Sequence, residues 1–182
     1  MATQAPTNLP LLYRGLAPLN RQDHGDKKVR RLDTIAGINE AHAVPVTVDE
    51  FMLAGRFFPI IFSTGEQSIP LALMGLHEGA NTFFDAEGKL LDDAVYVPAY
   101  LRRYPFMLAR LTEATDQLSL CFDPTSGAVG DEGDALFDGD EPSDRVLAWP
   151  FSACASLIDD DGLFGARAGE IDRSAGVRGT GR

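Results

Sequence analysis

Two prolines bracket the stretch that most constrains the fold of this chain. Pro98 suits the first position of a helix, where a fixed φ helps and no N–H is needed, and Pro105 cannot continue that helix. Between them there is room for only about a turn and a half of helix. The other apolar runs are short and bounded by turn residues: 59–63, 69–74, 81–85, 106–111 and 117–122. The pattern predicts a single α+β domain, a mostly antiparallel sheet with few short helices.

The clearest helix start lies at Thr47. Thr47 and Glu50 fit a capping box, and Val46 and Phe51 stand at the positions of a hydrophobic staple. We expect a helix from there to Phe58, with its apolar face in the core. The apolar runs 59–63 and 69–74 follow as a hairpin of two buried strands, with Pro70 at a strand start or edge.

The net charge of the 182-residue chain is -11, which argues against binding to nucleic-acid phosphates or anionic membranes. The N-terminal residues lack the basic and apolar regions of a signal peptide, and no apolar run is long enough to cross a bilayer. We therefore expect a cytoplasmic protein. The two cysteines, Cys121 and Cys154, have no metal or redox spacing, and no cofactor is predicted.

Charge is unevenly distributed along the chain. Residues 13–31 carry six of the basic residues, whereas 111–144 contain ten acidic residues and neither Lys nor Arg. The basic segment is either an anion or partner patch, or a solvated edge that complements the acidic segment. Calcium binding by the acidic segment is an alternative to a solvated loop, although no EF-hand spacing occurs there.

Chemically suggestive residues are few. His24 and Asp26 have the spacing of two ligands of a two-His-one-carboxylate iron site, but neighbouring cations oppose a metal, and a surface histidine in a turn is the simpler interpretation. Cys121 has no basic neighbour in sequence that would make it a thiolate. No nucleophile, base and oxyanion donors can be assembled.

The helix between the two prolines carries the best candidate binding residues. Tyr100, Arg103 and Tyr104 are three and four residues apart and share a face, and Arg102 adjoins them. Tyrosine and arginine dominate binding hot spots, so one interpretation is a recognition surface. The other is that the tyrosines cover the core while the arginines pair with the protein's own carboxylates.

Several motifs resemble the SapC family of bacterial proteins. The most specific is Tyr-Val-Pro-Ala-Tyr-Leu-Arg-Arg-Tyr-Pro-Phe at 96–106; others are Leu-Leu-Tyr-Arg-Gly-Leu-Ala-Pro-Leu-Asn at 11–20, Arg-Phe-Phe-Pro-Ile-Ile-Phe at 56–62 and Ile-Pro-Leu-Ala-Leu-Met-Gly-Leu at 69–76. The resemblance covers roughly residues 11–147. It implies association with a paracrystalline surface layer, and hence a place at the cell surface. A peptide-transport permease has the same name but is unrelated to this family.

Composition and the resemblance together suggest how the chain is divided. We expect a flexible arm at 1–12, a SapC-like α+β domain at 13–147, and a disordered Gly/Arg-rich tail at 148–182. Family members usually continue beyond this point as a longer, helical segment. The departure suggests truncation or a shifted frame after about Leu147, which would leave apolar sheet surface exposed.

Three hypotheses for function follow. The first is a non-catalytic SapC-like accessory or protein-interaction factor that contacts its partner through Tyr100, Arg102, Arg103 and Tyr104. The second is an enzyme or enzyme subunit that binds a small anionic substrate through Arg102, Arg103 and His24. The third is a calcium-dependent assembly module.

Overall fold

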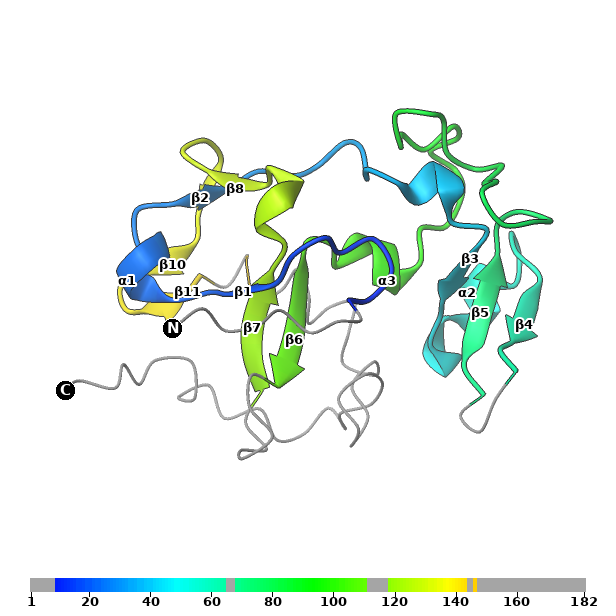
Figure 1. Cartoon of the computed structure of the whole chain (residues 1–182), viewed down its shortest axis with the longest axis horizontal. Coiled ribbons are helices and arrows are strands. Elements are labelled where there is room, and N and C mark those ends of the chain that lie inside the picture. The colour runs from blue at the N-terminus through cyan, green and yellow to red at the C-terminus, as the bar shows by residue number, and fades with distance from the viewer. Residues whose placement is uncertain (1–8, 65–67, 111–117, 144–145, 147–182) are drawn as a thin grey trace. The chain divides into compact units, whose positions relative to one another are not determined.

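The computed structural model describes residues 9–64, 68–110, 118–143 and 146 (Figure 1). The chain divides into two compact units. The central unit comprises Leu32–Arg102, and the flanking unit comprises Met1–Arg31 together with Arg103–Arg182. The boundary falls between Arg102 and Arg103, inside the stretch bracketed by the two prolines.

The central unit is built on a three-stranded antiparallel sheet of order β3-β5-β4. Its strands are β3 (Ala43–Pro45), β4 (Ile60–Phe62) and β5 (Pro70–Leu73). Ile61 lies opposite Leu71, and Leu71 lies opposite Pro45 on the other side. The hairpin predicted from 59–63 and 69–74 is thus confirmed, and Pro70 begins its strand as predicted. The expectation that both strands are buried is wrong for β4, because Ile61 and Phe62 are exposed.

The helices of the central unit are single turns. They are η1 (Ile38–Glu40), η2 (Val48–Glu50), α2 (Phe51–Ala54) and α3 (Ala99–Arg102). The capping box of Thr47 and Glu50 is present. However, the helix ends at Ala54 rather than Phe58, because the chain turns at Gly55, and the N–H groups of Phe57 and Phe58 both donate to the Ala54 carbonyl. Glycine is a poor helix former, which fits this early end.

Only part of the predicted apolar face of that helix is in the core. Ala54 and Phe58 are buried, and the Phe58 ring meets Phe83 edge-on with centroids 4.7 Å apart. Val48 and Met52 are instead 73% and 84% exposed. A helix this short turns only one side to the sheet, so residues on its other side face solvent.

The strand predicted at 81–85 is absent, apart from an isolated bridge between Phe84 and Leu90. Side-chain hydrogen bonds replace a ladder there. The Asn81 amide nitrogen donates to the Ile38 and Ala41 carbonyls, and its amide oxygen accepts from the Phe83 N–H. Short polar side chains that bond nearby backbone compete in this way with regular structure.

The flanking unit contains a second antiparallel sheet, of order β1-β7-β6, in which β6 and β7 form the hairpin predicted from their sequences. Its core includes Tyr13, Phe106, Cys121 and Phe122. A small sheet of order β8-β2-β9 and the hairpin β10-β11 complete it. The elements are β1 (Ala17–Pro18), α1 (Arg21–His24), β2 (Lys28–Val29), β6 (Phe106–Arg110), β7 (Leu118–Phe122), η3 (Pro124–Ser126), β8 (Val129–Gly130), β9 (Asp134–Ala135), β10 (Phe137–Asp138) and β11 (Glu141–Pro142).

The predicted fold class is confirmed: the chain is mostly antiparallel sheet with few short helices. The predictions for most of the N-terminal arm and for the tail fall on 1–8 and 147–182, outside the described residues. In the part of the chain that the structure does describe, no helix is long and apolar enough to span a membrane.

Candidate functional site

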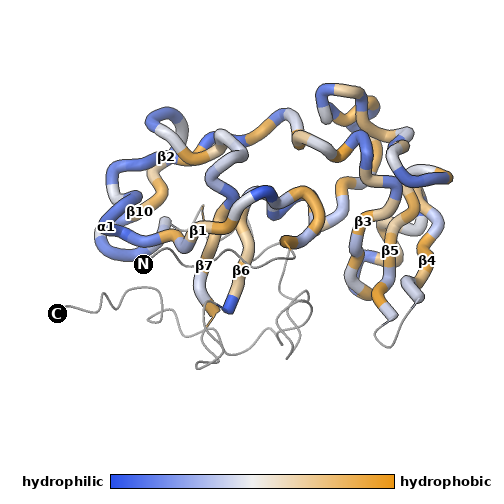
Figure 2. The backbone as a smooth tube through the Cα atoms, viewed as in Figure 1, coloured by the Kyte–Doolittle hydropathy of each residue, from blue (hydrophilic) through white to orange (hydrophobic). Residues whose placement is uncertain are grey.

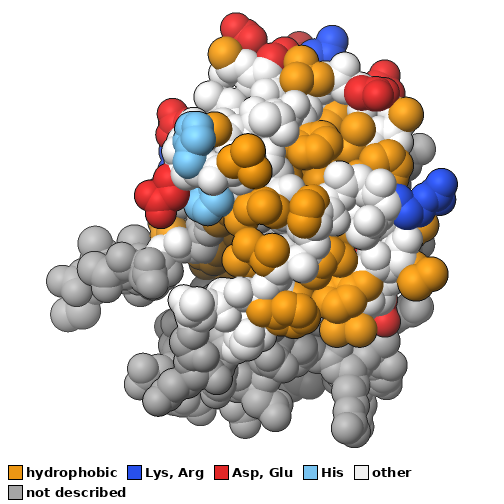
Figure 3. All heavy atoms as spheres, turned by 90° about the vertical axis from the view of Figure 1, so that its right-hand side faces the viewer, with side chains coloured by type: hydrophobic (Ala, Val, Ile, Leu, Met, Phe, Trp, Pro, Cys, Tyr) orange, Lys and Arg blue, Asp and Glu red, His pale blue; other side chains and the backbone are white. Residues whose placement is uncertain are grey.

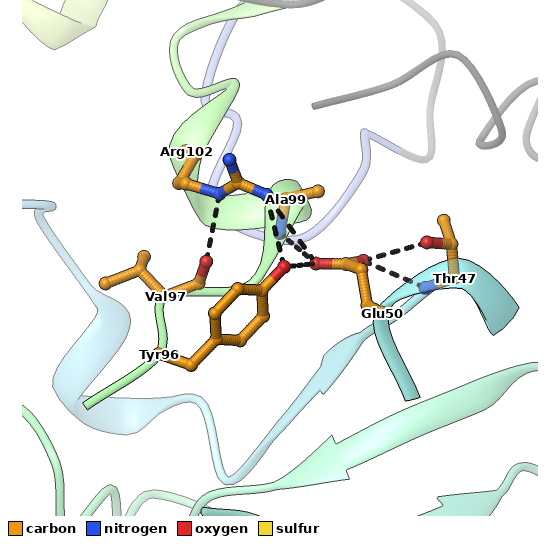
Figure 4. A network of polar contacts seen from close by, with 6 residues as sticks. All are labelled: Thr47, Glu50, Tyr96, Val97, Ala99 and Arg102. Carbon is orange, nitrogen blue, oxygen red and sulfur yellow. Dashed lines mark hydrogen bonds and ion pairs between the residues drawn. The ribbon is translucent and has the colours of Figure 1, made fainter. Parts of the chain in front are cut away.

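The densest polar network of the central unit surrounds Glu50, which is only 6% exposed (Figure 4). Its Oε2 atom accepts hydrogen bonds from the backbone N–H and the hydroxyl of Thr47, at 3.0 and 3.1 Å. Its Oε1 atom accepts from the Tyr96 hydroxyl at 2.7 Å and from the Ala99 N–H at 2.6 Å. One carboxylate therefore caps the start of η2 and the start of α3.

Arg102 closes this network from the last residue of α3. Its Nη2 atom lies 4.0 Å from Glu50 Oε1 and donates to the Tyr96 hydroxyl at 3.2 Å, and its Nε atom donates to the Val97 carbonyl at 3.0 Å. The guanidinium also lies over the Tyr96 ring, 5.6 Å from the centroid. Burial and the Glu50 carboxylate raise the pKa of Tyr96 above its ordinary value. Tyr96 is therefore a neutral donor to Glu50 at physiological pH.

Three of the four predicted contact residues at the Pro98–Pro105 stretch are buried: Tyr100, Arg103 and Tyr104 are 3%, 7% and 6% exposed. Tyr100 lies on α3 of the central unit, while Arg103 and Tyr104 belong to the flanking unit. Of the four, only Arg102 has a half-exposed side chain, and it pairs with a carboxylate of its own unit. The burial of the two tyrosines and the pairing of Arg102 with Glu50 are what the second interpretation of the Tyr/Arg stretch expects.

Tyr104 belongs to a second buried network in the flanking unit. Its ring meets that of Tyr13 edge-on, with centroids 5.3 Å apart. Burial, and then the charge of Asp123, raise the pKa of Tyr104 to about 12. The fully buried Asp123 accepts from the Arg14 N–H at 2.8 Å and from the N–H and hydroxyl of Thr125 at 2.8 and 2.7 Å.

His24 is held at the end of α1. Its Nδ1 atom lies 3.3 Å from the Asn20 nitrogen and 3.1 Å from the Asn20 oxygen, and its ring meets Phe122 edge-on at 5.2 Å. It is half-buried rather than on the open surface. Nowhere in the described residues do three His, Cys, Asp or Glu side chains gather as metal ligands.

The basic and acidic segments of the flanking unit contact each other. Lys27 Nζ lies 2.7 Å from Asp131 Oδ1, and Arg21 Nε lies 3.8 Å from Asp140 Oδ1. Lys27 lowers the pKa of Asp131 through this hydrogen bond. The two segments therefore complement each other at two solvent-exposed pairs, each of which contributes little stability.

Cys121 is fully buried on β7, and this burial raises the pKa of its thiol to about 12. A thiol with such a pKa is protonated at physiological pH, so Cys121 is not poised as a nucleophile. Cys154 lies outside the described residues.

The sequence analysis did not locate an apolar face of the sheet in the central unit. Successive strand residues point to opposite sides of a sheet, so Ala43, Pro45, Ile61, Leu71 and Leu73 share one face. All five are apolar, none is buried, and Ile61 is 38% exposed. We call these five residues the open sheet face. Figure 2 shows the hydrophobic character of the three strands, and Figure 3 shows hydrophobic side chains on the side of the molecule that lies to the right in Figure 1.

The comparisons with known proteins identify one family. The sequence model of the SapC family matches residues 19–159, most of the chain, and extends beyond Leu147, where we expected the resemblance to end. No curated protein and no solved structure matches the chain significantly. With the motif at 96–106 on α3 and at the start of β6, this match shows that the chain belongs to the SapC family.

Proposed function

We propose that this SapC protein is a non-catalytic accessory factor that acts by binding protein through the open sheet face. The observation that carries the proposal is the composition and exposure of that face: its five residues are all apolar and none is buried. Contiguous exposed apolar surface is costly in water and typically marks an interaction site on a folded protein.

Further exposed apolar side chains of the central unit lie at Phe62, which points to the opposite face of the sheet, and on α2. Phe62 on β4 is 59% exposed, and its ring lies 6.4 Å from that of Phe51 on α2. Met52 and Leu53 on α2 are 84% and 50% exposed. Covering apolar area returns about 25 cal/mol per Å², so a partner seated on the open sheet face would gain affinity from desolvation.

The polar side chains that an enzyme would use already make contacts within the protein, which supports a non-catalytic role. Glu50 accepts four hydrogen bonds and caps two helices, and Arg102 pairs with Glu50 and donates to Tyr96 and Val97. The enzyme hypothesis requires Arg102, Arg103 and His24 to meet one small anion. Arg102 already has a carboxylate partner, and the His24 ring packs on Phe122.

A photo-crosslinking residue at Leu71, in the centre of the open sheet face, tests the proposal in the native cells. The control carries the same residue at Leu76, which is 92% exposed and lies outside the sheet. We expect covalent protein adducts from position 71 and few from position 76. Equal yields at the two positions, or none at either, would contradict the proposal.

Fractionation of the same cells tests the surface-layer role that the family name implies. Adducts from position 71 recovered at the outer surface would support that role. Adducts recovered only from the cytosol would contradict it, while leaving the binding role in place.

A further inference from the structure

We propose that the outer edge of β4 pairs antiparallel with β4 of a second copy of this chain, so that two central units form one six-stranded sheet. This inference goes beyond the proposed function, because the second copy contacts the edge of β4 and, of the open sheet face, only Ile61.

The pairing of β4 with β5 determines which backbone groups of β4 face outward. Ser63 N–H donates to the Ile69 carbonyl, and Leu73 N–H donates to the Pro59 carbonyl. Residues 59, 61 and 63 therefore direct their backbone groups toward β5. Ile60 and Phe62 direct theirs to the opposite side, where no strand pairs with β4 among the residues that the structure describes.

The open edge of β4 is short, at three residues, but it lacks the charges and prolines that usually prevent pairing. From Ile60 to Ser63 the sequence is Ile-Ile-Phe-Ser, without charge or proline, and Ile61 and Phe62 are exposed. Exposed edges are normally protected by lysine, proline or a covering element. The opposite edge of the same sheet does have such protection, because β3 contains Pro45 and contacts α3.

The outward groups also fix the symmetric register. A two-fold axis at Ile61 places Ile61 opposite its own copy as a non-hydrogen-bonded pair. Ile60 then stands opposite Phe62 of the second copy, and Phe62 opposite Ile60, as the two hydrogen-bonded pairs. The outward backbone N–H and C=O groups of both residues are thus satisfied, and the contact is self-complementary, as a two-fold interface requires.

The same register continues the open sheet face. In one copy, Pro45, Leu71 and Ile61 form a row across three adjacent strands. Pairing at Ile61 joins this row to its two-fold equivalent, which gives a row of six apolar side chains. Side chains of non-hydrogen-bonded pairs are in close contact, so the two Ile61 side chains shield each other from water.

Two variants that place a positive or a negative charge at the two-fold axis test this arrangement. The full chain is expected to dimerise in sedimentation equilibrium, and Ile61→Lys and Ile61→Glu are each expected to raise the dimer dissociation constant at least about 100-fold by placing like charges face to face. An equimolar mixture of the two variants should recover a dimer containing one of each. The control pair, Leu76→Lys and Leu76→Glu, should dimerise like the unaltered chain.

A proline at position 62 tests the backbone contact. Phe62→Pro removes an outward N–H and leaves the ladder to β5 intact, whereas Phe62→Ala removes the ring and keeps that N–H. We expect Phe62→Pro to weaken the dimer more than Phe62→Ala. Hydrogen exchange at Ile61 and Ser63, which should stay slow in both variants, verifies that the β4–β5 pairing is intact.

Three outcomes would overturn the inference: a chain that stays monomeric at its highest soluble concentration, a dimer that withstands Ile61→Lys, and no selective association of the Lys and Glu variants. The crosslinked adducts from position 71 test the proposed function separately. Adducts with another protein, formed by a monomeric chain, would keep the binding role and remove the second copy. A monomeric chain without such adducts would remove both.

Discussion

The Glu50 carboxylate accepts a hydrogen bond from the backbone N–H of Ala99 at 2.6 Å, and so connects residues 49 positions apart in the central unit. Ala99 begins α3, where helical N–H groups lack intrahelical partners. Because the same carboxylate caps η2 through Thr47, its loss affects two elements at once. We therefore expect position 50 to be among the least tolerant in this unit.

Replacement of Glu50 by alanine should lower the free energy of unfolding by about 3 kcal/mol, because it leaves buried donors of Thr47 and Ala99 without an acceptor. Glu50→Gln, which keeps one acceptor oxygen, should cost less. Urea unfolding followed by circular dichroism measures both. The control is Asp49→Ala at the exposed neighbouring position, expected within about 0.5 kcal/mol of the unaltered chain. Equal losses at positions 49 and 50 would contradict the double-capping role.

Tyr96 and Arg102 should show energetic coupling. The Tyr96 hydroxyl donates to Glu50 and accepts from Arg102, so Tyr96→Phe and Arg102→Ala each remove part of one network. A double-mutant cycle on the free energy of unfolding should give a coupling energy of about 0.5–1 kcal/mol, since the guanidinium is half-exposed. Additive effects of the two substitutions would show that the contact contributes nothing measurable.

Asp123→Ala should destabilise the flanking unit by about 2–3 kcal/mol, because Asp123 is fully buried and accepts from Arg14 and Thr125. Amide hydrogen exchange should accelerate at Arg14 and Thr125 first, since their N–H groups lose their acceptor. The exposed Asp138 supplies the matched control, and Asp138→Ala should change neither stability nor exchange at these two amides. Unchanged exchange at both amides in Asp123→Ala would refute the assignment.

Features that depend on residues close together in the sequence were predicted correctly. The capping box at Thr47 and Glu50, the strand start at Pro70 and the β6–β7 hairpin depend on residues or apolar runs close together in sequence, and each is confirmed. The helix beyond Ala54 and the strand at 81–85 were wrong. Gly55 ends the helix early, and Asn81 bonds backbone groups about 40 residues away, which no local pattern indicates.

The burial and the partners of the predicted site residues are determined by contacts between residues that are far apart in the sequence. The candidate contact residues were chosen by residue type, and spacing alone could not show that Tyr100 and Tyr104 are buried or that Arg102 pairs with Glu50. The open sheet face was missed because an apolar strand has the same sequence whether or not another layer covers it. The signal available was the run Ile60–Ser63, which has no charge to protect a strand edge.

The stability of the chain should fall as pH rises above 9, because two buried groups keep their protons longer in the folded state than in the unfolded one. Burial raises the pKa of the Cys121 thiol from its ordinary 9.0 to about 12. Burial and the Asp123 charge raise the pKa of Tyr104 from 10.0 to about 12. A raised folded pKa contributes stability that is complete below the unfolded pKa and is lost as pH rises through the folded value.

Single substitutions separate the two contributions. The free energy of unfolding is measured with urea from pH 9 to pH 12. Cys121→Ala should make its fall with pH less steep from about pH 9 upward. Tyr104→Phe should make the fall less steep only above pH 10. Absorbance of tyrosinate gives a second readout, because Tyr104→Phe should remove the tyrosine that ionises near pH 12. Because both groups bind a proton over this range in the folded state, the two reductions in slope should add in the double variant. Curves that run parallel to that of the unaltered chain in both single variants would show that neither group titrates differently on unfolding.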